Sequence, residues 1–206
     1  METNLEYPSF RHKVYIAYDH AEDSEYYRQF HEIFCPRVLA SVHADTLQGT
    51  YDADPFVIGP DHIINRLIQN YFGSMSINVV LCGRNSWGLK YIDWEIFASL
   101  QCTKGLLGII LPTIAQNERG KYKIPLRLYD NIKSGYAKII DWNTLITEAY
   151  SPMYMLATYI EAAIQANTDV IDNRRKLKLT DERVAPAEGR SRGLVLSAFW
   201  SRWMPV

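Results

Sequence analysis

One glutamate stands out among the residues that could do chemistry, because its neighbours in the sequence are apolar or aromatic. Residues 91–101 have the pattern of a buried helix. The positions three and four away from Glu95 hold Tyr91, Ile92, Ala98 and Ser99. None of these is basic, and a carboxyl group so placed is partly desolvated, which raises its pKa and suits it to an active site. Judged from residue type alone, Glu95 could instead have a structural role, capping or hydrogen-bonding a neighbouring loop.

Polar and aromatic residues also follow three of the predicted strands. These groups are residues 18–20 (Tyr-Asp-His), 83–87 (Gly-Arg-Asn-Ser-Trp) and 112–113 (Pro-Thr). Parallel sheets bind ligands at the carboxyl ends of their strands. We therefore expect the three loops to meet in one crevice.

The elements that must position these residues alternate along the chain. Short apolar or β-branched runs predict strands at residues 13–18, 77–83, 106–111 and 137–140. Apolar residues spaced three and four apart predict helices at residues 23–34, 60–73, 91–101 and 152–167. Residues 37–60 are rich in glycine, proline and aspartate and predict a long loop with room for one short edge strand. This alternation predicts an α/β fold, a mostly parallel sheet flanked by helices on both faces.

Length and composition predict one domain with appendages. The chain has 206 residues, of which 48% are hydrophobic and 22% charged, enough for one sizeable core. We expect an extension at residues 1–12, the α/β domain at 13–167 and a tail at 168–206. The tail is charged up to Glu188 and ends in an aromatic stretch at residues 194–203, which docks on the domain or binds a partner.

The net charge and the cysteine content indicate which kinds of partner and which cell compartment the sequence favours. The formal net charge of -1 gives no general attraction to nucleic acid or anionic membranes, so any polyanion site must be local. The 3 cysteines are widely spaced, without a CxxC pair or a histidine at zinc-site spacing, which favours a reducing cytoplasm and no metal site. The first residues lack a signal-peptide pattern, and no apolar run approaches the ~20 residues that span a bilayer. We therefore expect a cytoplasmic protein without a membrane segment.

Several enzyme classes find no support in the sequence. Neither GxGxxG nor GxxxxGK[ST] follows a predicted strand, which disfavours dinucleotide dehydrogenases and P-loop nucleotidases. There is no GxSxG elbow and no histidine placed to activate a cysteine, which disfavours serine and thiol hydrolases.

Four stretches of the sequence, taken in order, resemble the TIR-like proteins of bacterial Thoeris antiphage defence. They are residues 14–20, 79–87, 91–96 and 124–132. In TIR enzymes an aromatic residue, commonly tryptophan, precedes the catalytic glutamate by four positions, and Tyr91 and Glu95 match that spacing. The sequence departs from the family pattern at Ala17, where serine is frequent, and at Tyr91, which replaces the tryptophan.

The resemblance implies a TIR-like, flavodoxin-like fold and an activity on NAD. The implied reaction cleaves the bond between nicotinamide and ribose, with NAD as substrate and neither a metal nor a resident cofactor. Glu95 would hold a ribose hydroxyl and oppose the positive charge of an oxocarbenium-like transition state. The ADP-ribose part would be released, cyclised or conjugated as a messenger for a downstream effector. A phage structural protein as trigger and a homo-oligomeric assembly are implied in the same way.

The resemblance also gives the loop residues candidate roles in binding NAD. The candidates are Tyr18, Asp19, His20, Asn85, Ser86 and Tyr91. The two tyrosines can stack on nicotinamide or adenine, as can Trp87, although that ring is more often part of a core. Asn85 and Ser86 can reach ribose or phosphate, or else cap the next helix or shape the turn. The histidine can transfer a proton, or simply lie at the surface.

Two other functions use the same fold. One is a TIR-like scaffold that assembles with other proteins without catalysis, which the departures at Ala17 and Tyr91 and the aromatic tail would suit. The other is a flavodoxin-like receiver or nucleotide-binding regulator, with Asp19 as a phosphorylation site.

Overall fold

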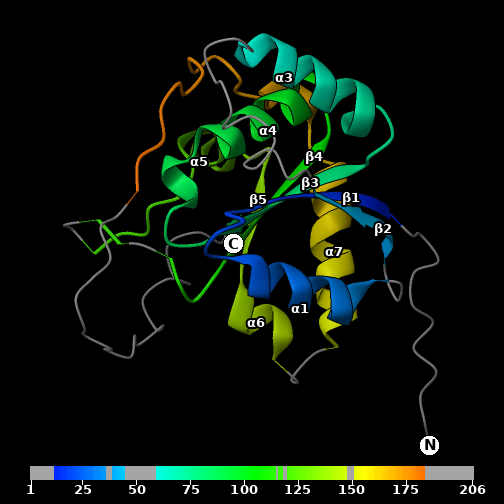
Figure 1. Cartoon of the computed structure of the whole chain (residues 1–206). Coiled ribbons are helices and arrows are strands. Elements are labelled where there is room, and N and C mark those ends of the chain that lie inside the picture. The colour runs from blue at the N-terminus through cyan, green and yellow to red at the C-terminus, as the bar shows by residue number, and fades with distance from the viewer. Residues whose placement is uncertain are drawn as a thin grey trace, which may run out of the picture.

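A five-stranded parallel sheet forms the centre of the protein (Figure 1). The computed structural model describes residues 12–35, 39–44, 59–114, 116–117, 120–147 and 151–183. The strands are β1 (His12–Ala17), β2 (Leu39–His43), β3 (Ile77–Cys82), β4 (Gly105–Ile110) and β5 (Lys138–Asp141). Their order in the sheet is β2-β1-β3-β4-β5, and every neighbouring pair is parallel. This arrangement confirms the predicted α/β fold.

Helices cover both faces of the sheet (Figure 1). One face packs against α1 (Ser24–Phe34), α6 (Trp142–Ile146) and α7 (Pro152–Ile164). The other packs against α3 (Pro60–Leu67) with its π-helical extension Ile68–Phe72, α4 (Lys90–Gln101) and α5 (Leu126–Lys133). In β1 the side chains alternate between these layers, because successive residues of a strand point to opposite faces. Val14 and Ile16 join the core with α1 and α7, whereas Tyr15 and Ala17 join the core with α3 and α4.

Most predicted elements are present, with shifted ends. The predicted edge strand is β2, and Pro60 lies in the first turn of α3 as its fixed φ favours. The last long helix ends at Ile164 rather than at residue 167, and α5 and α6 were not predicted. The expected extension before residue 12 and the aromatic stretch at 194–203 lie outside the described residues. Within the described ranges, no helix is both long and apolar enough to cross a membrane.

Residues 171–183, here called the strap, run over α4 and α5 without regular secondary structure. A fully buried arginine on α5, Arg127, holds the first part of the strap. Its guanidinium donates to Asp93 on α4 at 2.9 and 3.2 Å, to the Asn173 side chain at 2.9 Å and to the Lys176 carbonyl at 3.3 Å. Asn131 adds two bonds to the backbone of Asp172, at 2.8 and 3.0 Å. Polar side chains of α5 therefore satisfy backbone groups that the strap cannot pair within itself.

The end of the strap lies against the start of α4. Asp181 accepts a hydrogen bond from the Lys90 backbone N–H at 2.8 Å and so caps the helix, whose own N-cap residue makes no side-chain cap. The backbone N–H of Glu182 donates to the Gly88 carbonyl at 2.9 Å. The next residue, Arg183, donates to the buried carboxylate of Asp19 at 3.2 Å. The strap therefore connects the loop after β1 with the loop before α4.

Replacing Gly88 with alanine is expected to detach the end of the strap. A Cβ at this position would overlap the backbone carbonyl of Glu182, which a flexible side chain cannot relieve. We expect the amides of residues 178–183 to exchange with deuterium faster in Gly88→Ala than in the wild type. Gly59→Ala is the matched control, because a Cβ there meets nothing within 4 Å. Equal exchange in the two variants would contradict this account of the strap.

Candidate active site

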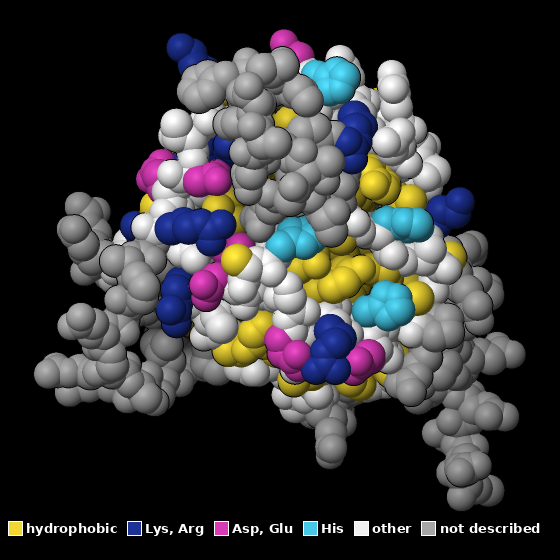
Figure 2. Space-filling model, viewed as in Figure 1, with side chains coloured by type: hydrophobic (Ala, Val, Ile, Leu, Met, Phe, Trp, Pro, Cys, Tyr) yellow, Lys and Arg dark blue, Asp and Glu magenta, His cyan; other side chains and the backbone are white. Residues whose placement is uncertain are grey.

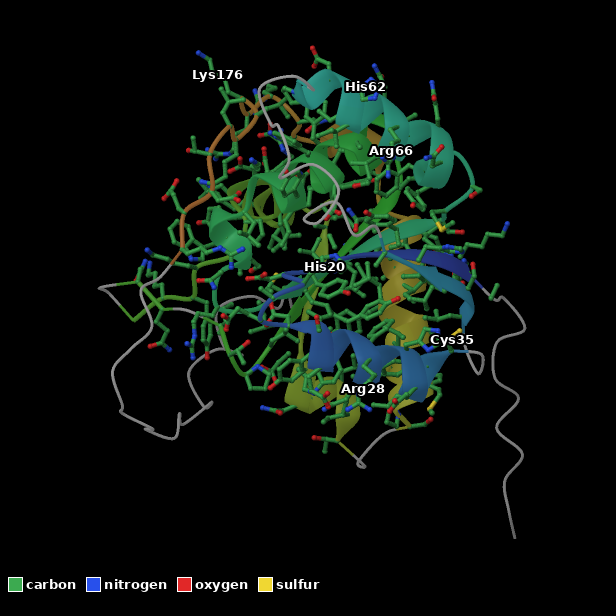
Figure 3. The ribbon with its side chains drawn as sticks, in the orientation of Figure 1. His20, Arg28, Cys35, His62, Arg66 and Lys176 are labelled. Atoms are coloured by element: carbon green, nitrogen blue, oxygen red, sulfur yellow. The ribbon has the colours of Figure 1, made fainter. Side chains whose placement is uncertain are left out.

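The strand order reverses direction between β1 and β3, and this point selects the candidate site. Chain connections leave the sheet in opposite directions there, so a crevice opens at the carboxyl ends of the two strands. The loops that follow are residues 18–23 after β1 and residues 83–89 after β3. Figure 3 shows His20 in the first of these loops, between α1 and the layer of α3 and α4. Figure 2 shows apolar side chains grouped on the same face, between α1 and α3.

Glu95 lies on the side of α4 that packs on the sheet. Its side chain is 4% exposed, and its Oε1 accepts a hydrogen bond from the Tyr15 hydroxyl at 2.7 Å. Asn78, which is the register partner of Tyr15 on β3, donates to the Glu95 carbonyl at 3.3 Å and to Ser99 Oγ at 3.2 Å. Two polar residues standing side by side on adjacent strands therefore fix the height and rotation of α4, and with them the position of the carboxylate.

The surroundings of this carboxylate are aromatic. The Tyr15 ring lies 5.4 Å from the Tyr71 ring and 4.9 Å from the Phe72 ring, measured between centroids. Burial raises the pKa of the nearby Tyr18 to about 12, with smaller contributions from Tyr27 and from the negative charge of Glu95. Tyr18 therefore stays a neutral hydroxyl at ordinary pH, and its interaction with Glu95 places it within electrostatic reach of that carboxylate.

The loop after β1 forms a short stack of rings. Tyr18 lies parallel to Tyr27 at 4.6 Å and at 31° to His20 at 4.0 Å. The Tyr18 ring is buried and His20 is half-buried. Ser24 donates its hydroxyl to the His20 carbonyl, which turns the chain into α1. The rings of Tyr27 and His20 cover the Tyr18 ring. A ligand would therefore have to contact the edge of the Tyr18 ring or displace His20.

The three predicted loops meet around an aspartate that the sequence reading had assigned only to a helix start. Asp23 is fully buried, and Thr113, in the loop after β4, donates to its Oδ1 at 3.2 Å. A Cβ on Gly83 would overlap the carboxyl group of Asp23, so the close approach requires glycine there. Its Oδ2 has no hydrogen-bond partner within the described ranges. Asp23 is the N-cap residue of α1, but its side chain makes no cap bond to that helix.

Burial and the neighbouring charge of Asp19 raise the pKa of Asp23 from 3.8 to about 7. The folded protein therefore holds this proton at pH values where the unfolded chain has released it, and stability falls as pH rises from about 4 to about 7. We expect Asp23→Asn, which imitates the protonated acid, to gain stability relative to the wild type across this range, by at most about 1.4 kcal/mol per pH unit. Urea unfolding of both proteins at about pH 5 and about pH 7 measures the difference. A difference that stays constant with pH would contradict the assignment.

The loop after β3 is held by its own polar residues. Ser86 is fully buried and donates to the Gly83 carbonyl at 3.0 Å, and the Asn85 carbonyl accepts from Gly88 at 2.8 Å. The Ser86 bond shapes the turn, which is one of the predicted structural uses of this pair. Asp181 of the strap makes the bond that caps α4. The other use, in ligand binding, stays a prediction.

Tyr91 lies one helical turn before Glu95, and its ring is part of the core. It is 4% exposed and meets Trp94 edge to face at 5.2 Å between ring centroids. The Lys90 ammonium lies 4.9 Å from the centre of the same ring. Trp87 is half-buried, with the Lys123 ammonium 4.2 Å from its ring centre. Neither ring is openly presented beside Glu95.

Sequence reasoning assigned Glu95, Tyr18, Asp19 and His20 to one candidate site, but it missed two partners of these residues. Tyr15 had only the signature of a strand residue, and its bond to Glu95 joins positions far apart in the chain. Arg183 lies in the strap, and no pattern in the sequence of the strap predicts that it packs on the rest of the domain. In the part of the chain that the structure describes, no group of three His, Cys, Asp or Glu is placed to hold a metal ion.

A hollow of about 770 Å³ opens on the other side of α4, and Glu95 does not line it. Its lining includes Asp93, which points away from Glu95 because residues two apart on a helix lie on nearly opposite sides. We assign the candidate active site to the strand ends, where the three predicted loops meet, rather than to this hollow.

Comparison with known proteins gives one family. Residues 15–116, about half of the chain, match the family described as Thoeris protein ThsB, TIR-like domain. The matched segment includes the second half of β1 and all of β3, α4 and β4, and therefore Tyr15, Asp23 and Glu95. No curated protein matches the chain.

Proposed function

Because the chain belongs to the Thoeris ThsB TIR-like family over residues 15–116, which indicates a role in antiphage defence, we propose that it cleaves NAD between nicotinamide and ribose. The observation that supports this activity best is the buried Glu95 carboxylate, held by Tyr15 of β1 and within electrostatic reach of Tyr18, which directly follows that strand. A carboxylate among rings, with little water near it, acts strongly on a charge that develops close by.

The proposed reaction breaks the C–N bond between the ribose C1′ carbon and the nicotinamide ring nitrogen. The bonding electron pair leaves with the ring, which departs as neutral nicotinamide, so a strong general acid is not needed. Positive charge collects on C1′ and the ring oxygen of ribose. Glu95 opposes this charge and accepts a hydrogen bond from a ribose hydroxyl. Attack of a water oxygen or of a hydroxyl of the acceptor on C1′, with loss of one proton, completes the product.

Tyr15 is proposed to position Glu95 rather than to touch NAD. Tyr15→Phe removes the hydroxyl that donates to Oε1 and keeps the ring between its aromatic neighbours. We expect kcat for nicotinamide release to fall about tenfold, since one misoriented group typically costs ~1–2 kcal/mol of transition-state stabilisation, with a smaller change in KM. Tyr136→Phe is the matched control, because that buried hydroxyl donates to the Lys104 carbonyl, in the turn before β4. Equal kcat values in the two variants would exclude a positioning role.

The trigger, the assembly and the messenger extend the same proposal. A phage structural protein would drive several copies of this chain together, and the ADP-ribose product, free, cyclic or conjugated, would activate a separate effector. The test is to incubate purified protein with NAD and extract from phage-infected cells, and to follow nicotinamide by chromatography and the second product by mass spectrometry. Release of nicotinamide only with infected extract supports the whole scheme. No release with any of several phages would contradict it.

One observation favours a second candidate, a TIR-like scaffold without catalysis. Tyr91, which occupies the position of the family's aromatic residue, has its ring packed against Trp94 in the core. Under this alternative the protein would bind infected-cell components and assemble while leaving NAD intact. Size-exclusion chromatography run beside the nicotinamide assay separates the two, because assembly without nicotinamide release supports the scaffold.

A further inference from the structure

The hollow on the outer side of α4 has the features of a ligand site that the proposed NAD cleavage does not use. Its volume, about 770 Å³, falls in the range of pockets that bind small molecules. The inner wall comes from the segments around the starts of α4 and α5, which contribute the apolar side chains of Trp87, Leu89, Pro125 and Leu126. Asp93 and Asp130, on the same two helices, also line it, and each is paired with an arginine. The outer wall is the strap, which contributes the charged side chains of Asp172, Arg174, Arg175, Lys176 and Lys178. Lys176 extends from the outer turn of the strap, at the rim (Figure 3).

Trp87, which lines the hollow, has an indole N–H without an acceptor among the described residues. The Nε1 atom of Trp87 is buried and makes no hydrogen bond within the described ranges. Buried N–H groups are nearly always paired, because leaving one unpaired costs free energy. The ring itself lies beside two ammonium groups, those of Lys123 at 4.2 Å and Lys178 at 5.8 Å from its centre. A donor without a partner therefore stands next to a concentration of positive charge.

The charges around the hollow do not balance. Six cations lie in or beside it: Lys123, Arg127, Arg174, Arg175, Lys176 and Lys178. Four of them form ion pairs, at 2.6 to 2.9 Å, with Asp93, Asp172, Asp130 and Glu182. Lys123 and Lys176 have no carboxylate within ion-pair distance among the residues that the structure describes. The protein as a whole carries -1, so this excess of two positive charges is local.

From this combination we propose that the hollow binds a small phosphate-bearing ligand with a flat ring, of the nucleotide class. The apolar wall suits the ring, since flat rings gain from contact with indole and aliphatic side chains. Lys123 and Lys176 would neutralise phosphate oxygens, and the Trp87 N–H would donate to an oxygen of the ligand. The ligand would touch both the strap and α4, so binding would also hold the strap in place.

This inference is independent of the proposed reaction. Asp93 faces the hollow and Glu95 faces the sheet, so the helix separates the two sites. A protein that fails to cleave NAD can still bind a nucleotide here, and a protein that cleaves NAD can fail to bind one. The experiment below therefore uses ADP, a nucleotide without a nicotinamide bond to cleave.

The test is titration of the full chain with ADP by calorimetry, together with NMR of the indole N–H groups. We expect saturable binding that weakens with added salt, and a shift of the Trp87 indole resonance, identified by its loss in Trp87→Phe. The double variant Lys123→Gln, Lys176→Gln should bind ADP at least about tenfold more weakly, equivalent to about 1.4 kcal/mol. Lys138→Gln, on β5, is the matched control and should bind like the wild type. Adenosine alone and pyrophosphate alone should each bind more weakly than ADP.

Several results would overturn the proposal. The first is absence of ADP binding, or ADP binding that the double lysine variant retains in full. The second is an unchanged Trp87 resonance at saturation, which would put ADP elsewhere, at the strand ends for example. If pyrophosphate bound as tightly as ADP, the ligand would not need a flat ring. If a single-stranded oligonucleotide bound more tightly than ADP, the surface would be a nucleic-acid site instead. Glu95→Gln should leave ADP binding at the hollow unchanged, and loss of binding in that variant would also overturn the assignment.

Discussion

Replacing Glu95 with glutamine is expected to lower nicotinamide release from NAD about 10²–10³-fold while leaving the fold intact, which is the usual cost of removing one preorganised group that stabilises a transition state. The amide has nearly the shape of the carboxylate and keeps an oxygen that accepts the bond from Tyr15. What it loses is the negative charge opposite the ribose. The measurement is chromatographic release of nicotinamide in the triggered state, with thermal unfolding of the same preparation as the check on folding.

The matched control is Glu32→Gln, the same chemical change on α1. Glu32 is exposed and pairs with Arg28 at 3.0 Å on the helix surface, where an ion pair contributes little. We expect its activity and melting temperature to equal those of the wild type. If Glu95→Gln also turned over NAD at the wild-type rate, Glu95 would not be the catalytic group, and the proposed mechanism would be wrong.

Arg127→Met is expected to be the most destabilising single change, lowering the free energy of unfolding by about 3–5 kcal/mol. Arg127 is fully buried, and its loss leaves the Asp93 carboxylate without its cation and two backbone carbonyls of the strap without a donor. Methionine fills much of the same volume, so the effect would come from the missing hydrogen bonds and charge rather than from a cavity. Urea unfolding followed by circular dichroism measures the loss.

Arg174→Met is the control for that experiment. The Arg174 side chain is 89% exposed and pairs with Asp172 at 2.8 Å, so its replacement should change stability by no more than about 0.5 kcal/mol. Removing Asp93 together with Arg127 should restore part of the loss, since no buried charge is then left alone. Equal stability of the two single variants would mean that the buried pair and the strap do not support the fold.

Elements with a strong local pattern were predictable from the sequence, and α4 is the best example. Its residues are apolar on nearly every side, which marked a buried helix to within one residue of its observed start. α5 was missed because two of its buried positions are the polar Arg127 and Asn131, which hide the apolar spacing. α6 has 5 residues, too few for a periodic signal. The spacing of apolar residues predicts helices whose buried side chains are apolar, but not helices whose buried side chains are polar.

The candidate site was predictable to the same extent. Glu95 could be singled out because a lone acid in an apolar helix is visible locally. The roles of Tyr15 and Asp23 could not, since each depends on a contact with a residue more than 50 positions away, Tyr15 with Glu95 and Asp23 with Thr113. The burial of Asp23 arises from the packing of Gly83 and Thr113 around it, and no property of residues 19–23 alone indicates it.

The strap also bears on how the protein is made. Translation proceeds from the N-terminus, so residues 171–183 leave the ribosome after every strand of the sheet has been synthesised. Until then Arg127 and Asn131 lack their backbone partners, and Asp19 lacks its cation. A nascent chain therefore holds its strand ends in an incomplete state. The loop after β1 and the start of α4 would therefore gain their last hydrogen bonds only once synthesis has passed residue 183.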